Sequence, residues 1–375
     1  MKHDERPPRK EPDELDALRS ELAGLDREVL LLAARRRDLV VRVGALKEEA
    51  GSPTRDFSQE RIVLERARAV ADELGLTPRL SDALMRLLIA HALATQEQQR
   101  IQHSATGSGR SVLVIGGAGR MGRWFVDFLS TQGFRVEVAD PAGQVEGFEW
   151  HEDWEAVDLK YDFVLIAAPL RPSAAILERL ARLNPAGIVF DIGSLKSPLA
   201  NPLRELSRAG VRVTSIHPMF GPDTEMLSGK HVVLVNIGDD EATRAVGNLF
   251  SSTMANVVEM SLEDHDRLIA LVLGLSHALN IAFFSTLARS GESTDRLARL
   301  SSTTFDEQLR VASKVAAENP HLYFEIQHLN EFGPETLALL KKVVVELEQV
   351  VISGDEATFT EIMEAGRQYL DLASS

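Results

Sequence analysis

The stretch VLVIGGAGRMGRWF, residues 112–125, decides how this chain folds. Four apolar residues run directly into the glycine pattern Gly117-x-Gly119-x-x-Gly122, and a helix-compatible sequence follows. These glycines permit a tight turn and the close approach of a pyrophosphate to the backbone, while the start of the helix offers free N–H groups to the phosphates. The stretch therefore predicts a strand, a turn and a helix that together bind a dinucleotide.

An acidic side chain predicts which dinucleotide binds. Asp140 ends the next predicted strand, where a carboxylate accepts hydrogen bonds from both ribose hydroxyls of NAD and repels the 2′-phosphate of NADP. The alternative is that Asp140 only begins the turn at Pro141. We expect NAD as the cofactor. The residues expected to contact it are Gly116, Gly117, Gly119, Arg120, Met121, Gly122, Asp140, Pro169 and Ser194.

Further strand signals follow this unit. Four short β-branched runs alternate with helix-compatible stretches, at 135–140, 162–169, 187–194 and 211–218. Such alternation is typical of a parallel, doubly wound sheet, which we place at 111–260. Beyond this point the strand signals end, and long apolar-periodic stretches predict an all-helical domain over 261–375.

The N-terminal hundred residues predict helices. Between residues 13 and 50 there is no proline, and leucine or valine recurs at mostly three- and four-residue spacing, at positions 15, 18, 22, 25, 29, 32, 39, 43 and 46. Such a helix runs about 55 Å, too long to bury its stripe within one small domain, so we expect a homodimer. Two shorter helical stretches follow. We assign 1–100 to a helical domain and the small, polar 101–110 to a linker.

The composition limits the function. The 375 residues carry 41 Lys and Arg against 56 Asp and Glu, a net charge of −15, which disfavours nucleic acid and anionic membranes as partners. Cysteine is absent, which excludes disulfides and thiolate metal sites, and we expect no metal centre. The first residues are charged and proline-rich, and no apolar run approaches about 18 residues. We therefore expect a cytoplasmic protein without a membrane segment.

Motifs beyond the glycine turn resemble one enzyme family. The sequence HPMFGP at 217–222 is preceded by DIGSLK at 191–196 and followed by His265-Asp266 and His277. Together these resemble the prephenate dehydrogenase family. The N-terminal hundred residues resemble the all-helical chorismate mutases, so the whole chain resembles the bifunctional chorismate mutase–prephenate dehydrogenases of tyrosine biosynthesis. The resemblance implies chorismate and prephenate as substrates, and it suggests feedback inhibition by tyrosine.

For the dehydrogenase, the resemblance implies NAD-dependent oxidative decarboxylation of prephenate to 4-hydroxyphenylpyruvate. The histidine matching His217 accepts the hydroxyl proton, with an expected pKa near the reference value of about 6.5, and the serine matching Ser194 orients that hydroxyl. His277 matches a substrate contact. His265 lies 12 residues earlier on one predicted helix, about 120° around it, so we expect His265-Asp266 to cap or pack the start of that helix.

The position that binds the ring carboxylate departs from the family. An arginine is usual six residues before a proline, and here that position, counted back from Pro320, is Lys314. Lysine keeps the charge but loses the bidentate fork. Arg310, one helical turn earlier, either supplies that fork or is a solvated surface charge.

The mutase reaction is a pericyclic rearrangement, which needs confinement of a dianion and positive charge beside the breaking ether bond. Arg36 stands in the apolar seam of the long helix, and Lys47 lies about 20° from the same face. The resemblance implies Arg19 and Arg36 for the carboxylates, Lys47 and Gln96 for the ether oxygen, and Asp56 with Glu60 for the ring hydroxyl. Arg19 lies about 25 Å from Arg36 along the helix, so it is expected to serve the site of a partner chain.

Two departures keep alternatives open. Gln59 and Ala92 replace a cationic residue and a serine of the mutase pattern, which predicts reduced mutase activity. The alternative to a bifunctional enzyme is a monofunctional prephenate or arogenate dehydrogenase whose N-terminal helices serve dimerisation or regulation. A β-hydroxyacid dehydrogenase would share the sheet and the helices but has no place for the HPMFGP motif.

Overall fold

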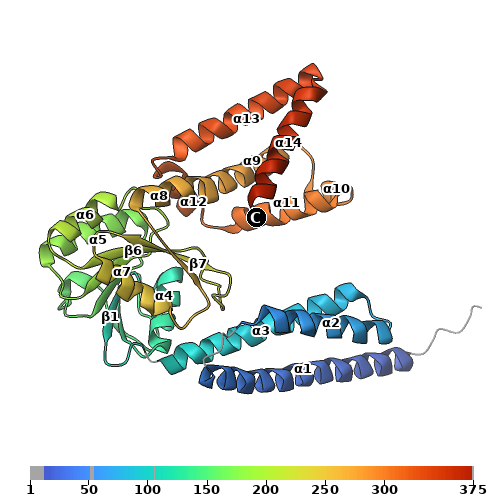
Figure 1. Cartoon of the computed structure of the whole chain (residues 1–375), viewed down its shortest axis with the longest axis horizontal. Helices are drawn as coiled ribbons and strands as arrows, with labels where there is room; N and C mark the ends of the chain where they lie inside the picture. The colour runs from blue at the N-terminus through green and yellow to red at the C-terminus, as the bar shows by residue number, and fades with distance from the viewer. Residues whose placement is uncertain (1–11, 51–54, 105, 374–375) are drawn as a thin grey trace, which may run out of the picture.

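The fold is that of a computed structural model, which describes residues 12–50, 55–104 and 106–373 (Figure 1). Helices come first, an eight-stranded sheet follows, and helices return at the C-terminus. In Figure 1 the two helical units extend from the sheet unit, one along the lower edge of the view and the other along the upper edge. This order confirms the predicted architecture of helical, parallel-sheet and helical parts.

The N-terminal helical unit consists of α1 (Pro12–Glu49), α2 (Phe57–Glu73) and α3 (Pro78–Ser104), and α3 contacts both of the others. The nine leucine and valine positions of the α1 stripe are all between 48% and 65% exposed. Helix α3 continues four residues past Arg100, and Ile101 is buried in the core of the sheet unit. The segment expected to be a linker therefore begins as helix and joins the two units firmly.

The sheet unit has the strand order β3-β2-β1-β4-β5-β6-β7-β8. All pairs are parallel except β6 with β7. The strands are β1 (Ser111–Ile115), β2 (Arg135–Ala139), β3 (Glu149–His151), β4 (Phe163–Ile166), β5 (Ile188–Asp191), β6 (Val213–Pro218), β7 (His231–Asn236) and β8 (Asn256–Met260). The predicted runs correspond to β1, β2, β4, β5 and β6, whereas β3, β7 and β8 were not predicted.

Helices cover both faces of this sheet. On one face α4 (Arg120–Thr131) and α7 (Asp240–Gly247) pack into a core with Phe125, Phe190 and Phe250. On the other face α5 (Leu170–Leu183) and α6 (Ala200–Arg208) pack through leucines into a second core. Crossover helices on two faces bring the C-terminal ends of the parallel strands to one edge, which is where ligands bind in such sheets.

The C-terminal helical unit begins with a long continuous helical segment. It comprises α8 (Leu262–Ile269), a π-helical segment (Ala270–Leu275) and α9 (Ser276–Arg289). By length and composition alone this 28-residue segment is apolar enough to cross a membrane, with a mean hydropathy of 1.9 in its most apolar window. The sequence analysis found no apolar run of this length, because polar residues such as Ser276 and Asn280 interrupt it.

The remaining helices are α10 (Thr294–Ala298), α11 (Thr303–Ala317), α12 (Pro320–His328), α13 (Gly333–Ser353) and α14 (Glu356–Ala373). Of these, α11, α12 and α13 contact the long segment. Helices α13 and α14 meet at the upper right of Figure 1, and both leave large apolar side chains exposed, among them Val344, Ile352 and Met363. Such a surface is suited to burial against another protein chain.

Candidate active sites

The turn between β1 and α4 is built for close backbone approach. Gly116 has φ +87°, a conformation that side chains other than glycine rarely adopt. A Cβ on Gly122 would lie 2.1 Å from the carbonyl oxygen of Gly116, so only glycine lets α4 pack against the turn. Gly119 caps α4 in an extended conformation without a side-chain hydrogen bond. The first N–H groups of the helix are therefore directed at whatever lies beyond this turn.

A cavity of about 800 Å³ opens beside this turn, at the C-terminal ends of β1, β2 and β4. Of the nine predicted cofactor residues, four line it: Gly116, Gly119, Asp140 and Pro169. The carboxylate of Asp140 is 7% exposed and accepts the N–H groups of Ala118, at 2.9 Å, and Ala142, at 2.8 Å. Each of its oxygens retains a second acceptor site, so the carboxylate can still accept from a ligand hydroxyl.

Two other predicted cofactor residues face elsewhere. The guanidinium of Arg120 forms ion pairs with Asp223, at 3.1 Å, and with Glu318, at 3.6 Å. Met121 packs against the core between α4 and the sheet. Arg120 thus connects the glycine turn with the C-terminal end of α11, so the C-terminal helical unit lies close to the nucleotide turn.

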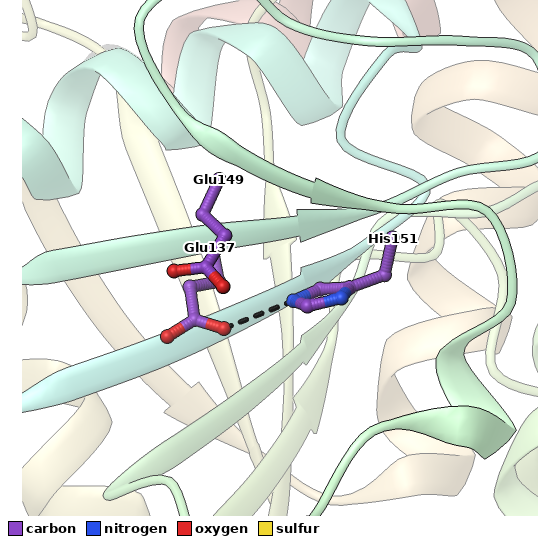
Figure 2. A group of neighbouring side chains, drawn as sticks. All are labelled: Glu137, Glu149 and His151. Atoms are coloured by element: carbon purple, nitrogen blue, oxygen red, sulfur yellow. Dashed lines mark hydrogen bonds and ion pairs between the residues drawn. The ribbon is translucent and has the colours of Figure 1, made fainter.

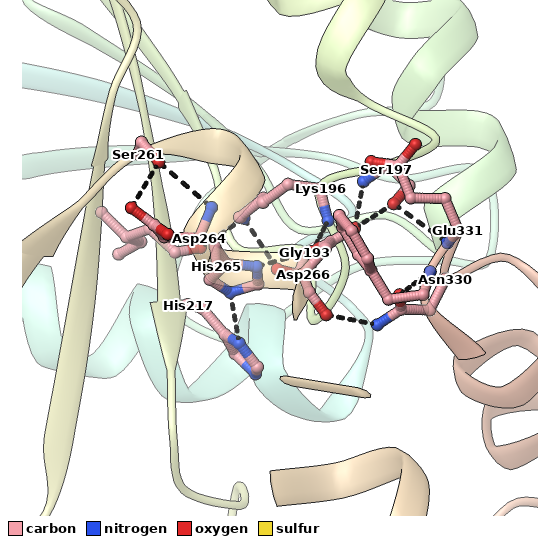
Figure 3. A network of polar contacts seen from close by, with 12 residues as sticks. Gly193, Lys196, Ser197, His217, Ser261, Asp264, His265, Asp266, Asn330 and Glu331 are labelled. Atoms are coloured by element: carbon pink, nitrogen blue, oxygen red, sulfur yellow. Dashed lines mark hydrogen bonds and ion pairs between the residues drawn. The ribbon is translucent and has the colours of Figure 1, made fainter. Parts of the chain in front are cut away.

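His217, at the end of β6, belongs to a buried chain of imidazoles (Figure 3). Its Nδ1 lies 2.9 Å from Nε2 of His265, and Nδ1 of His265 lies 2.6 Å from Oδ1 of Asp266. His217 is 5% exposed and His265 is fully buried. We expected His265-Asp266 to cap or pack the start of this helix; both are buried at the start of α8, and the cap is Ser261, whose hydroxyl accepts the N–H of Asp264. Burial lowers the pKa of His217 well below its ordinary value, and it also lowers the pKa of His265.

A fully buried lysine, Lys196, lies beside this chain of imidazoles and is hydrogen-bonded to its last member, Asp266. Nζ of Lys196 contacts Oδ1 of Asp191 at 3.0 Å and donates to the carbonyls of Gly193, at 2.7 Å, and Ile216, at 2.8 Å. The backbone N–H of Lys196 donates to Asp266. Ser194 lies two residues earlier in the same loop between β5 and α6, and it is partly exposed. Sequence reasoning quoted the motif that contains Lys196 but assigned the lysine no role.

The π-helical segment brings His277 nearly in line with His265. A π turn takes up about one extra residue, or 100° of rotation, so the expected separation of about 120° falls to about 20°. The expectation that these two histidines cannot share a face is therefore wrong. The ring of His277 stacks on Tyr323 with 4.2 Å between centroids, and its buried Nδ1 has no hydrogen-bond partner among the described residues. The amide of Gln327 satisfies the carbonyl of Gly274 inside the π segment, at 2.8 Å.

The two cations predicted on α11 are both exposed. Lys314 lies one helical turn before Glu318, which pairs with Arg120 of the nucleotide turn. Arg310 pairs with Glu307 on its own helix, with Nε 3.1 Å from Oε2. The guanidinium of Arg310 is therefore engaged on its own helix, whereas Lys314 lies one turn before the residue that contacts the nucleotide turn.

A second, smaller pocket lies in the N-terminal helical unit, with a volume of about 100 Å³. Five of the six residues predicted there line it: Arg36, Lys47, Asp56, Glu60 and Gln96. Gln59 and Ala92, the two departures from the pattern, line it as well. Arg19 lies elsewhere on α1, exposed and paired with Asp16 at 3.3 Å.

Several residues of this pocket also hold the helices together. Arg36 donates to the carbonyl of Leu88 at 2.9 Å, and its partial burial lowers the pKa of the guanidinium. The amide of Gln96 donates to the carbonyl of Val40 at 2.8 Å, which ties α3 to α1. The carboxylate of Asp56 caps α2 by accepting the N–H of Gln59 at 3.0 Å. These contacts fix a cation and an amide beside one small cavity.

Three family models match successive parts of the chain. They are chorismate mutase type II over residues 18–97, the nucleotide-binding domain of prephenate dehydrogenase over 138–259, and the dimerization domain of prephenate dehydrogenase over 261–365. A T-protein from Enterobacter agglomerans is 29% identical over 92% of this chain and 90% of its own. The 4-amino-4-deoxyprephenate dehydrogenase of Streptomyces pristinaespiralis is 32% identical over 67% of this chain and 88% of its own.

The chain belongs to the chorismate mutase–prephenate dehydrogenase family. Among solved structures, prephenate dehydrogenase from A. aeolicus has the same fold, with a TM-score of 0.57 and 22% identity over 71% of this chain and 99% of that one. In these terms the N-terminal helical unit is the mutase part, and the sheet and C-terminal helical units form the dehydrogenase. We call the cavity lined by Arg36 and Gln96 the mutase pocket.

The mutase part is fastened to the dehydrogenase beside the mutase pocket. Glu97 follows Gln96 on α3, and its buried carboxylate accepts the N–H groups of Leu227, at 2.7 Å, and Met254, at 2.5 Å. Arg55 binds Glu60 of the mutase pocket at 2.9 Å and donates to Ser228 Oγ, also at 2.9 Å. Leu227 and Ser228 lie in the loop between β6 and β7, which follows His217. The mutase pocket is therefore joined to the loop between β6 and β7 by direct hydrogen bonds.

One further group of titratable residues lies at the edge of the sheet (Figure 2). Glu137 on β2 accepts a hydrogen bond from the hydroxyl of Tyr161 at 2.5 Å and lies 3.0 Å from Nε2 of His151 on β3. Burial and this hydrogen bond raise the pKa of Tyr161. These contacts attach the short strand β3 to its neighbour, so we assign the cluster a structural role.

Proposed function

We propose that this enzyme converts chorismate to prephenate in the mutase pocket and then converts prephenate to 4-hydroxyphenylpyruvate, with NAD, beside the glycine turn. The observation that carries the proposal is that one chain holds a pocket lined by Arg36, Lys47 and Gln96 and, at the edge where the parallel strands end, both a buried histidine chain and a nucleotide turn. The proposed domain limits are 1–100, 111–260 and 261–375. A soluble, cytoplasmic enzyme fits the biosynthetic roles of its relatives and its net charge of −15.

The residues around the cavity fit a dinucleotide. The glycine turn leaves no room for a Cβ, the start of α4 points its N–H groups outward, and the cavity is large enough for an adenosine moiety. When bound, NAD supplies the hydride acceptor. Asp140 would accept from the ribose hydroxyls, and its charge favours NAD over NADP.

The dehydrogenase step requires one group that accepts a proton. His217 accepts the proton of the ring hydroxyl through Nε2 as hydride leaves the same carbon, and loss of carbon dioxide makes the ring aromatic. Ser194 orients the hydroxyl, His277 contacts the substrate, and Lys314 binds the ring carboxylate. Stacking on Tyr323 supports the place of His277, since it fixes the ring without using either nitrogen.

The mutase step needs no proton transfer. Arg36 binds a carboxylate, Lys47 and Gln96 bind the ether oxygen, and Asp56 with Glu60 surrounds the ring hydroxyl. Arg19 of a second copy would complete the site, because Arg19 does not line the pocket of its own chain and pairs there with Asp16. We therefore propose a homodimer that buries the exposed stripe of α1 and the apolar surface of α13 and α14. Tyrosine as a feedback inhibitor of this dimer remains part of the proposal.

A second candidate substrate is favoured by the 32% identity to 4-amino-4-deoxyprephenate dehydrogenase. In that substrate an amino group stands where prephenate carries the 4-hydroxyl, and an amine N–H can also donate to Nε2 of His217. Turnover of prephenate, arogenate and 4-amino-4-deoxyprephenate by the same enzyme preparation would rank the three. Prephenate should give the highest kcat/KM.

Paired substitutions test the two activities in the full-length enzyme. Arg36→Ala should abolish mutase turnover and leave dehydrogenase turnover on supplied prephenate largely intact, whereas His217→Asn should do the reverse. Arg37→Ala is the matched control, because Arg37 is exposed and pairs only with the adjacent Asp38 among the described contacts. Mutase activity within about tenfold of wild type in Arg36→Ala, which corresponds to less than about 1.4 kcal/mol, would contradict the assignment.

A further inference from the structure

The hydrogen bonds around His265 permit only one arrangement of protons while both rings are neutral. Nδ1 of His265 faces the carboxylate Oδ1 of Asp266, so this nitrogen must carry the proton and donate it. Nε2 of His265 is then the acceptor. Nδ1 of His217, which faces it at 2.9 Å, must donate. It follows that the lone pair of His217 lies on Nε2, the nitrogen that the proposed reaction requires.

We propose that His265 and Asp266 are positioning residues for the dehydrogenase, which fix His217 in the tautomer and orientation that expose the Nε2 lone pair to the substrate. This inference rests on the proposed function of His217. Neither residue needs to touch prephenate, because both act through the ring of His217. The pair therefore has a role that goes beyond packing the start of α8.

The contacts of Asp266 explain how the pair is held in place. Its Oδ1 also accepts the backbone N–H of Lys196 at 2.8 Å, and its Oδ2 accepts both the N–H and the hydroxyl of Ser197. The backbone carbonyl of Asp266 accepts the amide of Asn330 at 2.9 Å, from the chain after α12 (Figure 3). The carboxylate is thus oriented by three donors besides His265, and it cannot rotate without losing them.

His265 and Asp266 are essentially without solvent exposure. Replacing a buried ionic pair by well-packed apolar side chains is often neutral or stabilising, so stability alone does not explain such a pair. When His217 becomes an imidazolium, its Nδ1–H still finds the lone pair of His265, and the negative charge of Asp266 acts on the new positive charge through the intervening ring. The charged groups that face the chain from the sheet side are Lys196 and Asp191, which are hydrogen-bonded to each other.

Three variants of the full-length enzyme separate positioning from packing. In His265→Gln the amide oxygen can accept from His217 and the amide N–H can donate to Asp266, so kcat on prephenate should stay within about fivefold of wild type. In His265→Leu the volume is retained but neither bond is possible, and kcat should fall about 100-fold with little change in KM. Asp266→Asn should also lower kcat, because the amide of asparagine can donate its N–H to Nδ1 of His265. His265 would then carry its proton on Nε2, and the lone pair of His217 would lie on Nδ1 instead of Nε2.

NMR spectra of the histidine side chains identify the cause of any loss of kcat. Side-chain ¹H–¹⁵N spectra of the histidines should show His217 protonated at Nδ1 in wild type and in His265→Gln, and a mixture of tautomers in His265→Leu. The signals of His217 are assigned with His217→Asn. Removal of the negative charge in Asp266→Asn should move the acid limb of the kcat profile to lower pH, since that charge favours the imidazolium.

Two controls keep the outcomes distinct. His231→Gln changes an exposed histidine of the same unit and should leave both activities at wild-type levels. The thermal unfolding of the dehydrogenase part, measured by calorimetry on each variant, reports whether that part has folded. A wild-type enzyme that does not oxidise prephenate would overturn the proposed function. An active wild-type enzyme with an equally active His265→Leu variant, or with His217 protonated at Nε2, would overturn the inference alone.

Discussion

The ring of His217 lies among groups that disfavour its protonated form. Burial is the main cause, and the neighbouring His265 and Lys196 act in the same direction, so the pKa of His217 lies well below its ordinary value of 6.5. The sequence-based expectation of a titration near 6.5 is therefore too high, because the sequence did not show that this histidine is buried beside a lysine. A neutral imidazole at neutral pH is the form that accepts a proton.

The pH dependence of the dehydrogenase follows from this shift. We expect turnover at saturating prephenate and NAD to change little between about pH 6.5 and 8 and to fall only as the pH drops through the lowered pKa, where His217 becomes protonated. Initial rates from pH 5 to 9 would measure this limb, with mutase turnover followed in parallel to detect acid unfolding. A midpoint at or above 6.5 would contradict the assigned role or its environment.

Asp140 permits a test of cofactor choice. Asp140→Asn preserves the shape of the side chain but removes the charge that would face the 2′-phosphate of NADP. The ratio of kcat/KM for NAD to that for NADP should therefore fall by about tenfold, or about 1.4 kcal/mol. Asp158→Asn, a change at an exposed carboxylate that pairs with Lys160, should leave the ratio as in wild type. Strong NADP use by the unchanged enzyme would refute the preference.

At this scale, a residue could be predicted where helical spacing or the family pattern places it. Helical spacing indicated Arg36 and Lys47, the resemblance implied Gln96, and one pocket contains all three. The link from Lys196 to Asp266 was not found, because 70 residues separate the two and nothing local predicts that they meet. The bond between His217 and His265, across 48 residues, was missed for the same reason.

Among the elements, the turn between β1 and α4 depends most on one residue. In Gly122→Ala the new Cβ would lie 2.1 Å from the carbonyl oxygen of Gly116 and 2.8 Å from Cα of Gly117, so the backbone of the turn must move. We expect a loss of NAD affinity of at least about tenfold and a loss of roughly 1–3 kcal/mol in stability. Calorimetric titration with NAD and thermal unfolding would measure the two effects.

Gly366→Ala is the control for this substitution. Gly366 lies within α14, where an added Cβ meets open space, so alanine should leave NAD binding unchanged and raise stability by up to about 1 kcal/mol. Equal NAD affinity in Gly122→Ala and wild type would show that the turn yields without cost. The glycine pattern would then have no direct part in holding the dinucleotide.

Element boundaries followed from periodicity where periodicity was regular. The long α1 and the five central strands were predicted, but β3 has only three residues and β8 is an exposed edge strand, so neither carries a clear apolar pattern. The π-helical segment lies within an apolar run that reads equally well as α-helix. Rotation estimates from sequence assume a constant 100° per residue, and one extra residue in a turn is enough to invalidate them.

At the scale of the whole molecule, Glu97 makes two of the hydrogen bonds that attach the mutase part to the dehydrogenase. Glu97→Ala would leave the buried N–H groups of Leu227 and Met254 without their acceptor, at a cost of about 1–3 kcal/mol each. We expect calorimetry to show the mutase part unfolding separately from, and before, the dehydrogenase. Gln98→Ala, one residue further on the exposed side of α3, should unfold like wild type. A single unchanged transition in Glu97→Ala would mean that other contacts dominate the interface.

The order of the three units could be predicted from the sequence, but their attachment could not. Composition changes at each boundary, whereas the partners of Glu97 are backbone N–H groups, which every residue except proline has. The contact of Arg55 could not be predicted either, because nothing in the sequence around its partner Ser228 indicates a contact between units. Docking between units is therefore visible only when the chain is folded.

The passage of α3 from the mutase part into the sheet core has a consequence for how this chain can be divided. A protease cut or a gene truncation between residues 101 and 110 would leave the apolar side chain of Ile101 at a frayed end of one fragment and an empty space in the core of the other. Each fragment would then expose surface prone to aggregation. Physical separation is thus a poor way to isolate either activity, and point substitutions that silence one site within the intact chain are the better tool.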